Sequence, residues 1–387
     1  MADTVALVMS GGGARGAYEM GVLSVLLPVL EKRGERPRIV VGTSVGAFNA
    51  AFVAGHAHRP LAEAIAHGED VWANLRWRDV MGPLVSPRGI ARSLRYAGRL
   101  LWVKQPRIDA VLYPEALPAT LARLLSFDQL ARNVEDGTVG AAAVTTTSAH
   151  TSRTVVFHAG GPSPERDSVR GIEYVGTPLT SEQVRASGAI PGLFPAVHVP
   201  EPARARGWYF DGGTRLNTPI KPALELGADR VVVIGLNSIA PGPDEIAGEY
   251  RPDVFEGAAQ ILQALLIDRL DQDVRELAEE NLPGEDGRRI PYIFVTPRVR
   301  HGIGDLASTI WRKRYSGVRG FARDPNVSTL GRFTAAGNGP VHGEFLSFLF
   351  FAPEFTRALM EIGREDARAW LEQEHEDGPW QMGPLGA

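Results

Sequence analysis

The chain has 387 residues, of which 44% are hydrophobic and 22% are charged, as in ordinary globular proteins. It can therefore bury a sizeable core, which excludes disorder as its main state. The 41 Lys and Arg residues against 45 Asp and Glu residues give a net charge of -4, which excludes a generally basic nucleic-acid-binding protein. The absence of cysteine excludes disulfides, thiolate zinc sites and thiol nucleophiles.

The N-terminal region predicts a β-α-β-α order. A short apolar run at 5–9 ends in glycines and is typical of a buried parallel strand. Residues 14–30 carry apolar side chains at helical spacing, although Pro28 predicts an early end or a kink. A second short strand is expected at 39–41, and the small apolar residues of 44–55 predict a closely packed helix. This order indicates a parallel sheet covered by helices.

The remaining elements predict an α/β core that ends near residue 300, followed by a tail. No apolar stretch approaches the ~20 residues needed to span a bilayer, and the N-terminus lacks the basic region of a signal peptide. We therefore expect a cytoplasmic protein. Residues 56–133 are expected to be helical and irregular; strands are expected at 139–147, 154–158, 208–210, 230–236 and 292–296, and helices at 181–189, 257–281, 304–315 and 353–374.

The first candidate site is a glycine-rich loop, residues 10–16, between the first strand and the first helix. Its glycines let backbone N–H groups face a ligand, and the helix N-terminus adds partial positive charge. The loop therefore predicts binding of a phosphate or of a transient oxyanion. It also satisfies the G-x-G-x-x-G pattern of dinucleotide-binding proteins, which requires an acidic residue at the end of the second strand. Glu31 and Glu35 precede that strand, which disfavours a nucleotide-dependent oxidoreductase.

The second candidate site is the pentapeptide 42–46, Gly-Thr-Ser-Val-Gly, which matches the G-x-S-x-G nucleophile elbow. It follows an apolar strand and opens a helix of small residues, as the elbow requires. Two kinds of group could activate Ser44. His301 and His342 come late enough in the chain for a Ser-His-Asp triad, whereas Asp211, after the apolar run 208–210, could act on the serine directly.

Four segments, taken in order, resemble the motifs of the patatin-like phospholipases, also called lipid acyl hydrolases. They are similar to the family's oxyanion loop, its nucleophile elbow, a block that packs near the active site, and its Asp-Gly-Ala/Gly motif. The resemblance covers about residues 5–300. The matching segments are 11–16, 42–46, 186–195 and 211–213, and Asn217 and Pro219 also fit.

The resemblance implies an α/β, three-layer fold with a mainly parallel central sheet flanked by helices. The catalytic domain would span residues 1–300 and include a basic helical insertion at about 56–133. Residues 301–387 would form a C-terminal helical extension, whose role the resemblance does not explain.

The resemblance also implies a serine hydrolase that cleaves acyl ester bonds of lipids through a Ser-Asp dyad without histidine. No cofactor and no metal-binding residue are predicted, and the sequence does not decide whether the activity depends on a metal. A lipid acyltransferase and a non-catalytic lipid-binding protein are the alternatives. Because an aspartate with an ordinary pKa near ~3.9 is a weak base for a serine hydroxyl, most of the rate enhancement is expected from the oxyanion loop. Arg15 is expected to hold this loop or else to meet a lipid phosphate. The residues assigned are Ser44 and Asp211 for catalysis, Gly11, Gly12, Gly13, Arg15 and Gly16 for the oxyanion hole (with Gly12 and Gly13 as the main donors), and Gly42, Gly46, Gly212 and Gly213 as motif support.

A basic segment could bring the protein to its lipid substrate. Residues 76–107 contain eight basic residues and one acidic residue, within a chain that is otherwise acidic. Basic amphipathic helices with tryptophan lie on anionic membrane surfaces, so peripheral membrane contact is one interpretation; a solvated helix face is the other. The sequence does not indicate an oligomeric state. The residues proposed for membrane contact are Arg88, Arg92, Arg95, Arg99 and Trp102.

Overall fold

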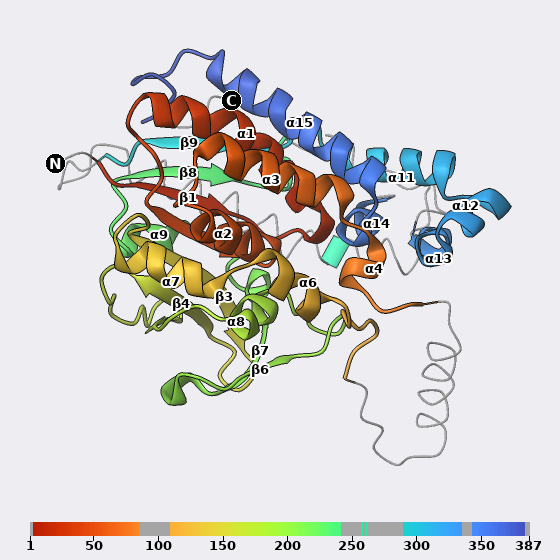
Figure 1. The fold of residues 1–387 in the computed structure, drawn as a ribbon, viewed down its shortest axis with the longest axis horizontal. Coiled ribbons are helices and arrows are strands. Elements are labelled where there is room, and N and C mark those ends of the chain that lie inside the picture. Colours follow the sequence, from red (N-terminus) through yellow and green to blue (C-terminus); the bar gives the residue numbers. More distant parts are fainter. Residues whose placement is uncertain are drawn as a thin grey trace.

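The computed structural model describes residues 3–84, 109–240, 257, 260–261, 289–334 and 343–383. Within these residues a nine-stranded, mostly parallel sheet forms the centre of the molecule (Figure 1). Seven strands follow the order β5-β4-β3-β2-β1-β8-β9, while β7 pairs with both β3 and β6. The strands are β1 (Val5–Met9), β2 (Ile39–Thr43), β3 (Ala141–Ser148), β4 (Thr154–Gly160), β5 (Ile172–Gly176), β6 (Val197–Val199), β7 (Gly207–Asp211), β8 (Arg230–Ile234) and β9 (Tyr292–Val295).

The pairing around β1 is parallel on both sides, as the predicted β-α-β order requires. β1 lies between β2 and β8, and β2–β3, β4–β5 and β8–β9 are also parallel. The antiparallel pairs are β3–β4, β3–β7 and β6–β7. Apart from Arg230 at the start of β8, the residues of β1, β2, β8 and β9 are buried, which explains why these strands read as apolar runs in the sequence. The predicted α/β class with a mainly parallel sheet is confirmed.

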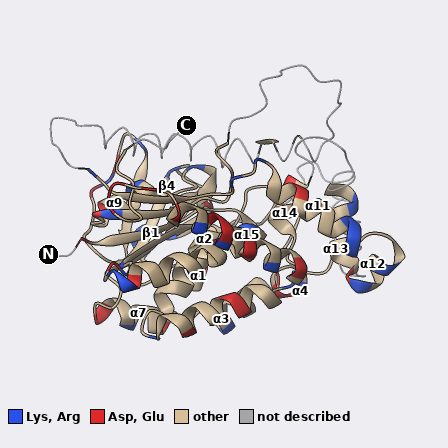
Figure 2. Cartoon of the chain, turned by 90° about the horizontal axis from the view of Figure 1, so that it is seen from above, with Lys and Arg blue, Asp and Glu red and all other residues tan. Residues whose placement is uncertain are grey.

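Helices cover both faces of the sheet. Figure 2 shows α1, α3 and α7 on one side and α9 on the other. The helices are α1 (Gly16–Lys32), α2 (Val45–Gly55), α3 (Leu61–Asn74), α4 (Trp77–Val80), α6 (Leu117–Leu124), α7 (Phe127–Glu135), α8 (Ser181–Ser187), α9 (Ile220–Glu225), α11 (Gly302–Arg314), α12 (Gly317–Arg323), α13 (Pro325–Thr334), α14 (Glu344–Leu349) and α15 (Pro353–Leu371); short 3-10 turns form at η1 (Gly13–Arg15), η2 (Ala203–Ala205) and η3 (Gly212–Thr214).

The first helix, α1, does not end at its proline. It continues through Pro28 to Lys32, so the predicted early end is wrong. Proline removes one backbone hydrogen bond from the helix. The buried side chains of Leu26, Leu27 and Leu30 on either side of Pro28 hold this part of the helix against the core and offset that loss.

The C-terminal helix α15 packs along α1 and α3 and forms part of the same helical layer (Figure 1). Its backbone approaches α1 so closely that a Cβ atom at Gly363 would lie 2.3 Å from the Tyr18 carbonyl oxygen. The Tyr18 hydroxyl also donates a hydrogen bond of 2.9 Å to Asp366. A domain boundary near residue 300 stays a prediction.

Several predicted features lie outside the described residues. They are the proposed membrane-contact residues Arg88, Arg92, Arg95, Arg99 and Trp102, the candidate histidine His342, and most of the helix expected at 257–281. Peripheral membrane contact therefore stays a prediction. None of the helices within the described ranges is both long enough and apolar enough to cross a bilayer.

Candidate active site

The strand pairing brings Ser44 and Asp211 to the same edge of β3. The first half of β3 pairs with β2, and the last of these pairs joins Thr43 to Thr145. The second half of β3 extends beyond β2 and pairs with β7, in which Asp211 lies opposite Thr146. β2 and β7 thus approach each other end to end along one strand. Ser44, which follows Thr43, meets Asp211 where these two strands end.

The serine and the aspartate form a direct hydrogen bond. The Ser44 hydroxyl donates to Asp211 Oδ2 over 2.7 Å, and both residues are buried, with 6% and 4% exposure. Ser44 has a φ of 53° and a ψ of -121°, a left-handed conformation that is uncommon outside glycine and that a sharp strand-to-helix turn imposes. Gly42 and Gly46 lie against each other beneath it: a Cβ atom at Gly42 would be 2.1 Å from the Gly46 oxygen.

The segment that includes α8 fixes both residues of this pair. The Ser187 hydroxyl accepts a hydrogen bond of 2.8 Å from the Ser44 backbone N–H and donates one of 2.6 Å to the Thr145 carbonyl. The backbone N–H of Asp211 donates to the Ala189 carbonyl over 2.9 Å. The family resemblance predicts that this block packs near the site but assigns no role to Ser187, since a serine in a helix carries no motif of its own.

Burial changes the chemistry of the aspartate. It raises the pKa of Asp211 to about 7, although hydrogen bonds from the Ser44 hydroxyl and the Gly213 backbone N–H favour the ionised form. The Gly213 N–H donates to Oδ1 over 2.7 Å, so the two carboxylate oxygens have separate partners. Gly212 packs against Thr145, where a Cβ atom would lie 2.5 Å from the carbonyl oxygen. Asp211 is thus a stronger base than its ordinary pKa implies.

Two amides of the glycine loop are available to a ligand. Among the residues that the structure describes, no hydrogen-bond acceptor faces the backbone N–H of Gly12 or Gly13. Gly13 has a φ of 61°, and a Cβ atom there would lie 2.2 Å from the Phe348 carbonyl oxygen, so both its conformation and its surroundings require glycine.

The other predicted oxyanion residues have their amides engaged. The Gly11 N–H donates to the Asn217 side chain over 3.1 Å. The N–H groups of Arg15 and Gly16 donate to carbonyl oxygens within the same turn. These three residues therefore shape the loop, and Asn217, which the sequence matched to the family motif, anchors its start.

The Arg15 side chain holds the loop against α14. It is 2% exposed and forms an ion pair with Glu344, and it donates to the Ser347 hydroxyl over 2.8 Å and to Asn237 over 2.7 Å. Its guanidinium group also stacks on the ring of Phe348, 4.1 Å from the centroid. Of the two predicted roles, holding the loop agrees with these contacts, because the guanidinium is buried and bonds to groups of the protein itself.

His301 also lies beside Glu344 rather than beside the serine. Its Nδ1 is 3.2 Å from Glu344 Oε1, whereas the Ser44 hydroxyl bonds to Asp211. Burial raises the pKa of Glu344, but the charge of Arg15 and the hydrogen bond with His301 outweigh it and hold that pKa at about 2. Glu344 is therefore ionised and acts as a buried counter-charge for Arg15.

Two cavities meet at the serine. The larger has a volume of about 520 Å³ and lies among α2, α3 and α6; the smaller, of about 250 Å³, lies over the glycine loop and Asp211. Ser44 and Gly13 line both of them. The described part of the chain contains no cluster of three or more His, Asp or Glu side chains that could hold a metal ion.

This arrangement has the parts that acyl transfer needs: a hydroxyl nucleophile bonded to a base of raised pKa, the backbone N–H groups of Gly12 and Gly13 beside it, and a cavity on either side. The model of a family described as Patatin-like phospholipase matches residues 7–224.

Several solved structures are similar at low identity. VipD from Legionella pneumophila is 14% identical with a TM-score of 0.35, over 95% of this chain and 66% of VipD. Human GIVD cytosolic phospholipase A2 is 12% identical with a TM-score of 0.43, and the match covers 95% of this chain and 58% of the phospholipase chain. The heterodimeric ExoU-SpcU complex of Pseudomonas aeruginosa contains a chain that is 16% identical with a TM-score of 0.30. That match covers 97% of this chain and 73% of the matched chain. This chain thus covers less than two thirds of the first two structures. No curated protein matches the sequence.

Proposed function

Because the chain belongs to the patatin-like phospholipase family, we propose that it is a serine hydrolase that cleaves acyl ester bonds of lipids, with Ser44 as nucleophile and Asp211 as its base. The observation that carries the proposal is the 2.7 Å hydrogen bond from the Ser44 hydroxyl to Asp211, at the point where two cavities meet. Because no other side chain intervenes between them, the carboxylate takes the proton directly from the serine.

In the first half of the reaction the acyl group moves to Ser44. As its Oγ bonds to the ester carbon, the hydroxyl proton passes to Asp211 Oδ2, and the carbonyl oxygen becomes an oxyanion. The Gly12 and Gly13 N–H groups stabilise this charge; losing one such donor typically costs ~10²–10³ in rate. The bond from carbon to the alcohol oxygen then breaks, and Asp211 returns the proton to the departing alcohol.

In the second half, water releases the acid. A water molecule attacks the acyl carbon while its proton passes to Asp211. The oxyanion forms again at the same two amides. When the bond to Oγ breaks, Asp211 gives the proton back to Ser44, so both residues return to their starting states and a free carboxylic acid leaves.

The experiment that tests the proposed function is an assay of fatty-acid release by the purified chain. The panel contains phosphatidylcholine, lysophosphatidylcholine, monoacylglycerol and p-nitrophenyl esters, each with and without an added alcohol. Release of fatty acid supports a hydrolase, and transfer to the alcohol would support the acyltransferase alternative. Binding of lipid without cleavage of any ester would contradict the proposal.

The kcat/KM for ester hydrolysis should decrease at acidic pH. Only the ionised carboxylate of Asp211 can accept the serine proton, and its pKa lies at about 7. We therefore expect kcat/KM to fall about tenfold per pH unit below pH 7 and to level off above it. The measurement is kcat/KM for a p-nitrophenyl ester against pH, with the far-ultraviolet circular dichroism followed to exclude acid unfolding. Constant kcat/KM down to pH 5 would contradict this assignment.

A further inference from the structure

The reaction separates the ester into an acyl group, which is transferred to Ser44, and an alcohol, which leaves. Two cavities meet at Ser44. Resting on the proposed function, we propose that the larger cavity binds the acyl chain that is transferred to Ser44 and that the smaller cavity binds the departing alcohol. The larger cavity then determines the preference for acyl-chain length, and the smaller cavity determines the preference for the leaving alcohol.

The position of the proton donor sets this direction. When the ester bond breaks, the alcohol oxygen must receive its proton from Asp211, so it must lie on the side of the acyl carbon that faces this residue. Asp211 lines the smaller cavity together with Gly213 and Thr214, and none of the three lines the larger one. The acyl chain, on the opposite side of the carbon, then extends into the larger cavity.

The chemistry of the larger cavity fits a hydrocarbon chain. Helices α2, α3 and α6 contribute to its lining together with other segments, and most of the lining side chains are aliphatic or aromatic. Its volume of about 520 Å³ lies within the range of ligand pockets and is about twice that of its neighbour. These lining side chains include Phe48, Phe52, Val71, Trp72, Leu121 and Leu124.

The buried polar groups on this wall already have partners in the protein. The Asn49 amide donates to Glu19 over 2.6 Å and to the Gly16 carbonyl over 3.0 Å, and it accepts the Trp72 indole N–H over 3.0 Å. The Thr120 hydroxyl donates to the Asp79 carbonyl. An apolar chain can therefore cover these groups without breaking a hydrogen bond, which would otherwise be costly.

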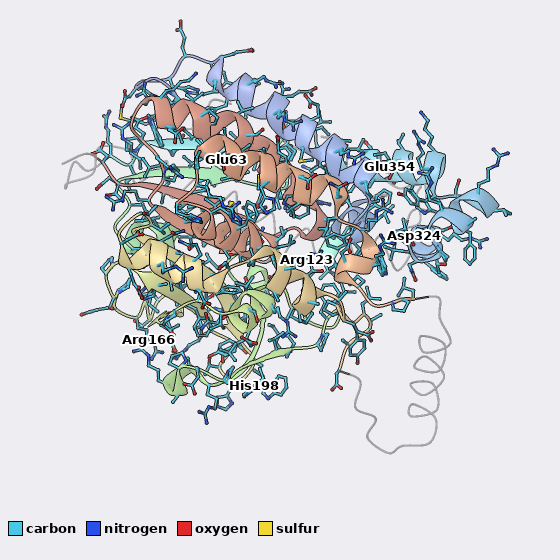
Figure 3. All side chains as sticks on the ribbon, in the orientation of Figure 1. Glu63, Arg123, Arg166, His198, Asp324 and Glu354 are labelled. Atoms are coloured by element: carbon cyan, nitrogen blue, oxygen red, sulfur yellow. The ribbon has the colours of Figure 1, made fainter. Side chains whose placement is uncertain are left out.

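The larger cavity also reaches the surface. His198, which lies on the β6–β7 hairpin at the outer edge of the molecule, is exposed and lines it (Figure 3). Trp208, on the facing strand, lines it as well and is 57% exposed. The charged side chains in its lining, Glu115 and Arg185, both keep some exposure to solvent. A lipid chain can thus enter at the hairpin and reach Ser44.

A matched pair of variants tests the assignment, because each cavity has a half-buried leucine that the other lacks. Leu124 lines only the larger cavity, and Leu193 lines only the smaller. Leu124→Trp and Leu193→Trp therefore narrow one cavity each by the same chemical change. Both are measured with p-nitrophenyl esters from butyrate to stearate and with hexanoate esters of alcohols from methanol to octanol.

For the wild-type chain we expect kcat/KM to rise about fourfold per added methylene of the acyl chain until the cavity is full. Leu124→Trp should move the preferred acyl chain to a shorter length and leave the order of the alcohols unchanged. Leu193→Trp should reduce activity on the larger alcohols and leave the preferred acyl chain unchanged. Leu124→Ala, which enlarges the same cavity, should favour longer chains and serves if the tryptophan variant fails to fold.

The reverse pattern, in which the Leu124 variants change only the alcohol preference, would overturn the assignment. So would variants that each change both preferences equally. A wild-type chain that cleaves none of these esters would instead refute the proposed function itself, so the two failures are distinguishable.

Discussion

Replacing Ser44 by alanine should reduce kcat for ester hydrolysis by about 10⁶-fold, the loss that removal of the nucleophile produces in serine hydrolases. Without Oγ no acyl-enzyme can form, although the Gly12 and Gly13 amides and both cavities are kept. The variant should fold, because Asp211 retains its hydrogen bond from the Gly213 N–H. The measurement is single-turnover hydrolysis of a p-nitrophenyl ester, with circular dichroism to confirm the fold.

A matched serine variant controls for this result. Ser181 begins α8, and its hydroxyl bonds only to the neighbouring Glu182 side chain among the described residues. Ser181→Ala should therefore leave kcat unchanged. A fluorophosphonate probe should label the wild type and Ser181→Ala but not Ser44→Ala. Undiminished turnover or labelling of Ser44→Ala would place the nucleophile elsewhere.

Replacing Glu344 by alanine should lower the free energy of unfolding by about 3–5 kcal/mol. Glu344 is the counter-charge of Arg15, and both side chains are buried, with 4% and 2% exposure. Its removal leaves a guanidinium charge in the core beside the glycine loop. Because Arg15 holds that loop, kcat should fall as well. The free energy of unfolding is measured by urea unfolding followed by tryptophan fluorescence, and kcat is measured without urea.

An exposed ion pair provides the control for Glu344. Glu361 bonds to Arg364 on α15 with 53% of its side chain exposed. Exposed pairs contribute little, so Glu361→Ala should change the free energy of unfolding by less than about 1 kcal/mol. If Glu344→Ala lowered the free energy of unfolding as little as Glu361→Ala, the buried ion pair would not stabilise the fold.

The elements around the elbow could be predicted because their signals are local. The apolar run of β1, the glycine loop and the start of α1 lie within residues 5–16, and β2, Ser44 and α2 lie within residues 39–55. Asp211 could be found because a strand ends there in an Asp-Gly-Gly turn. Its strength as a base could not, since the pKa of about 7 comes from burial in the assembled site.

Contacts between distant segments escaped prediction for the same reason. Arg15 and Glu344 are separated by 329 residues, and nothing in either local sequence pairs them. The segment that holds the glycine loop, α14, also lies beyond residues 7–224, which the family model matches. The pairing of β7 with the outer half of β3 likewise depends on register rather than on a pattern along the chain. Packing on the core, finally, overrode the local effect of Pro28.

The serine-aspartate dyad is tested most directly by comparing the kcat of Asp211→Asn with the kcat of His301→Gln. The amide keeps the shape of the side chain but cannot accept the proton of Ser44, so Asp211→Asn should lose about 10²–10⁴ in kcat. His301→Gln should retain most of its activity, because His301 bonds to Glu344. Full activity of a folded Asp211→Asn, with activity lost in His301→Gln, would contradict a serine-aspartate dyad and support a histidine base.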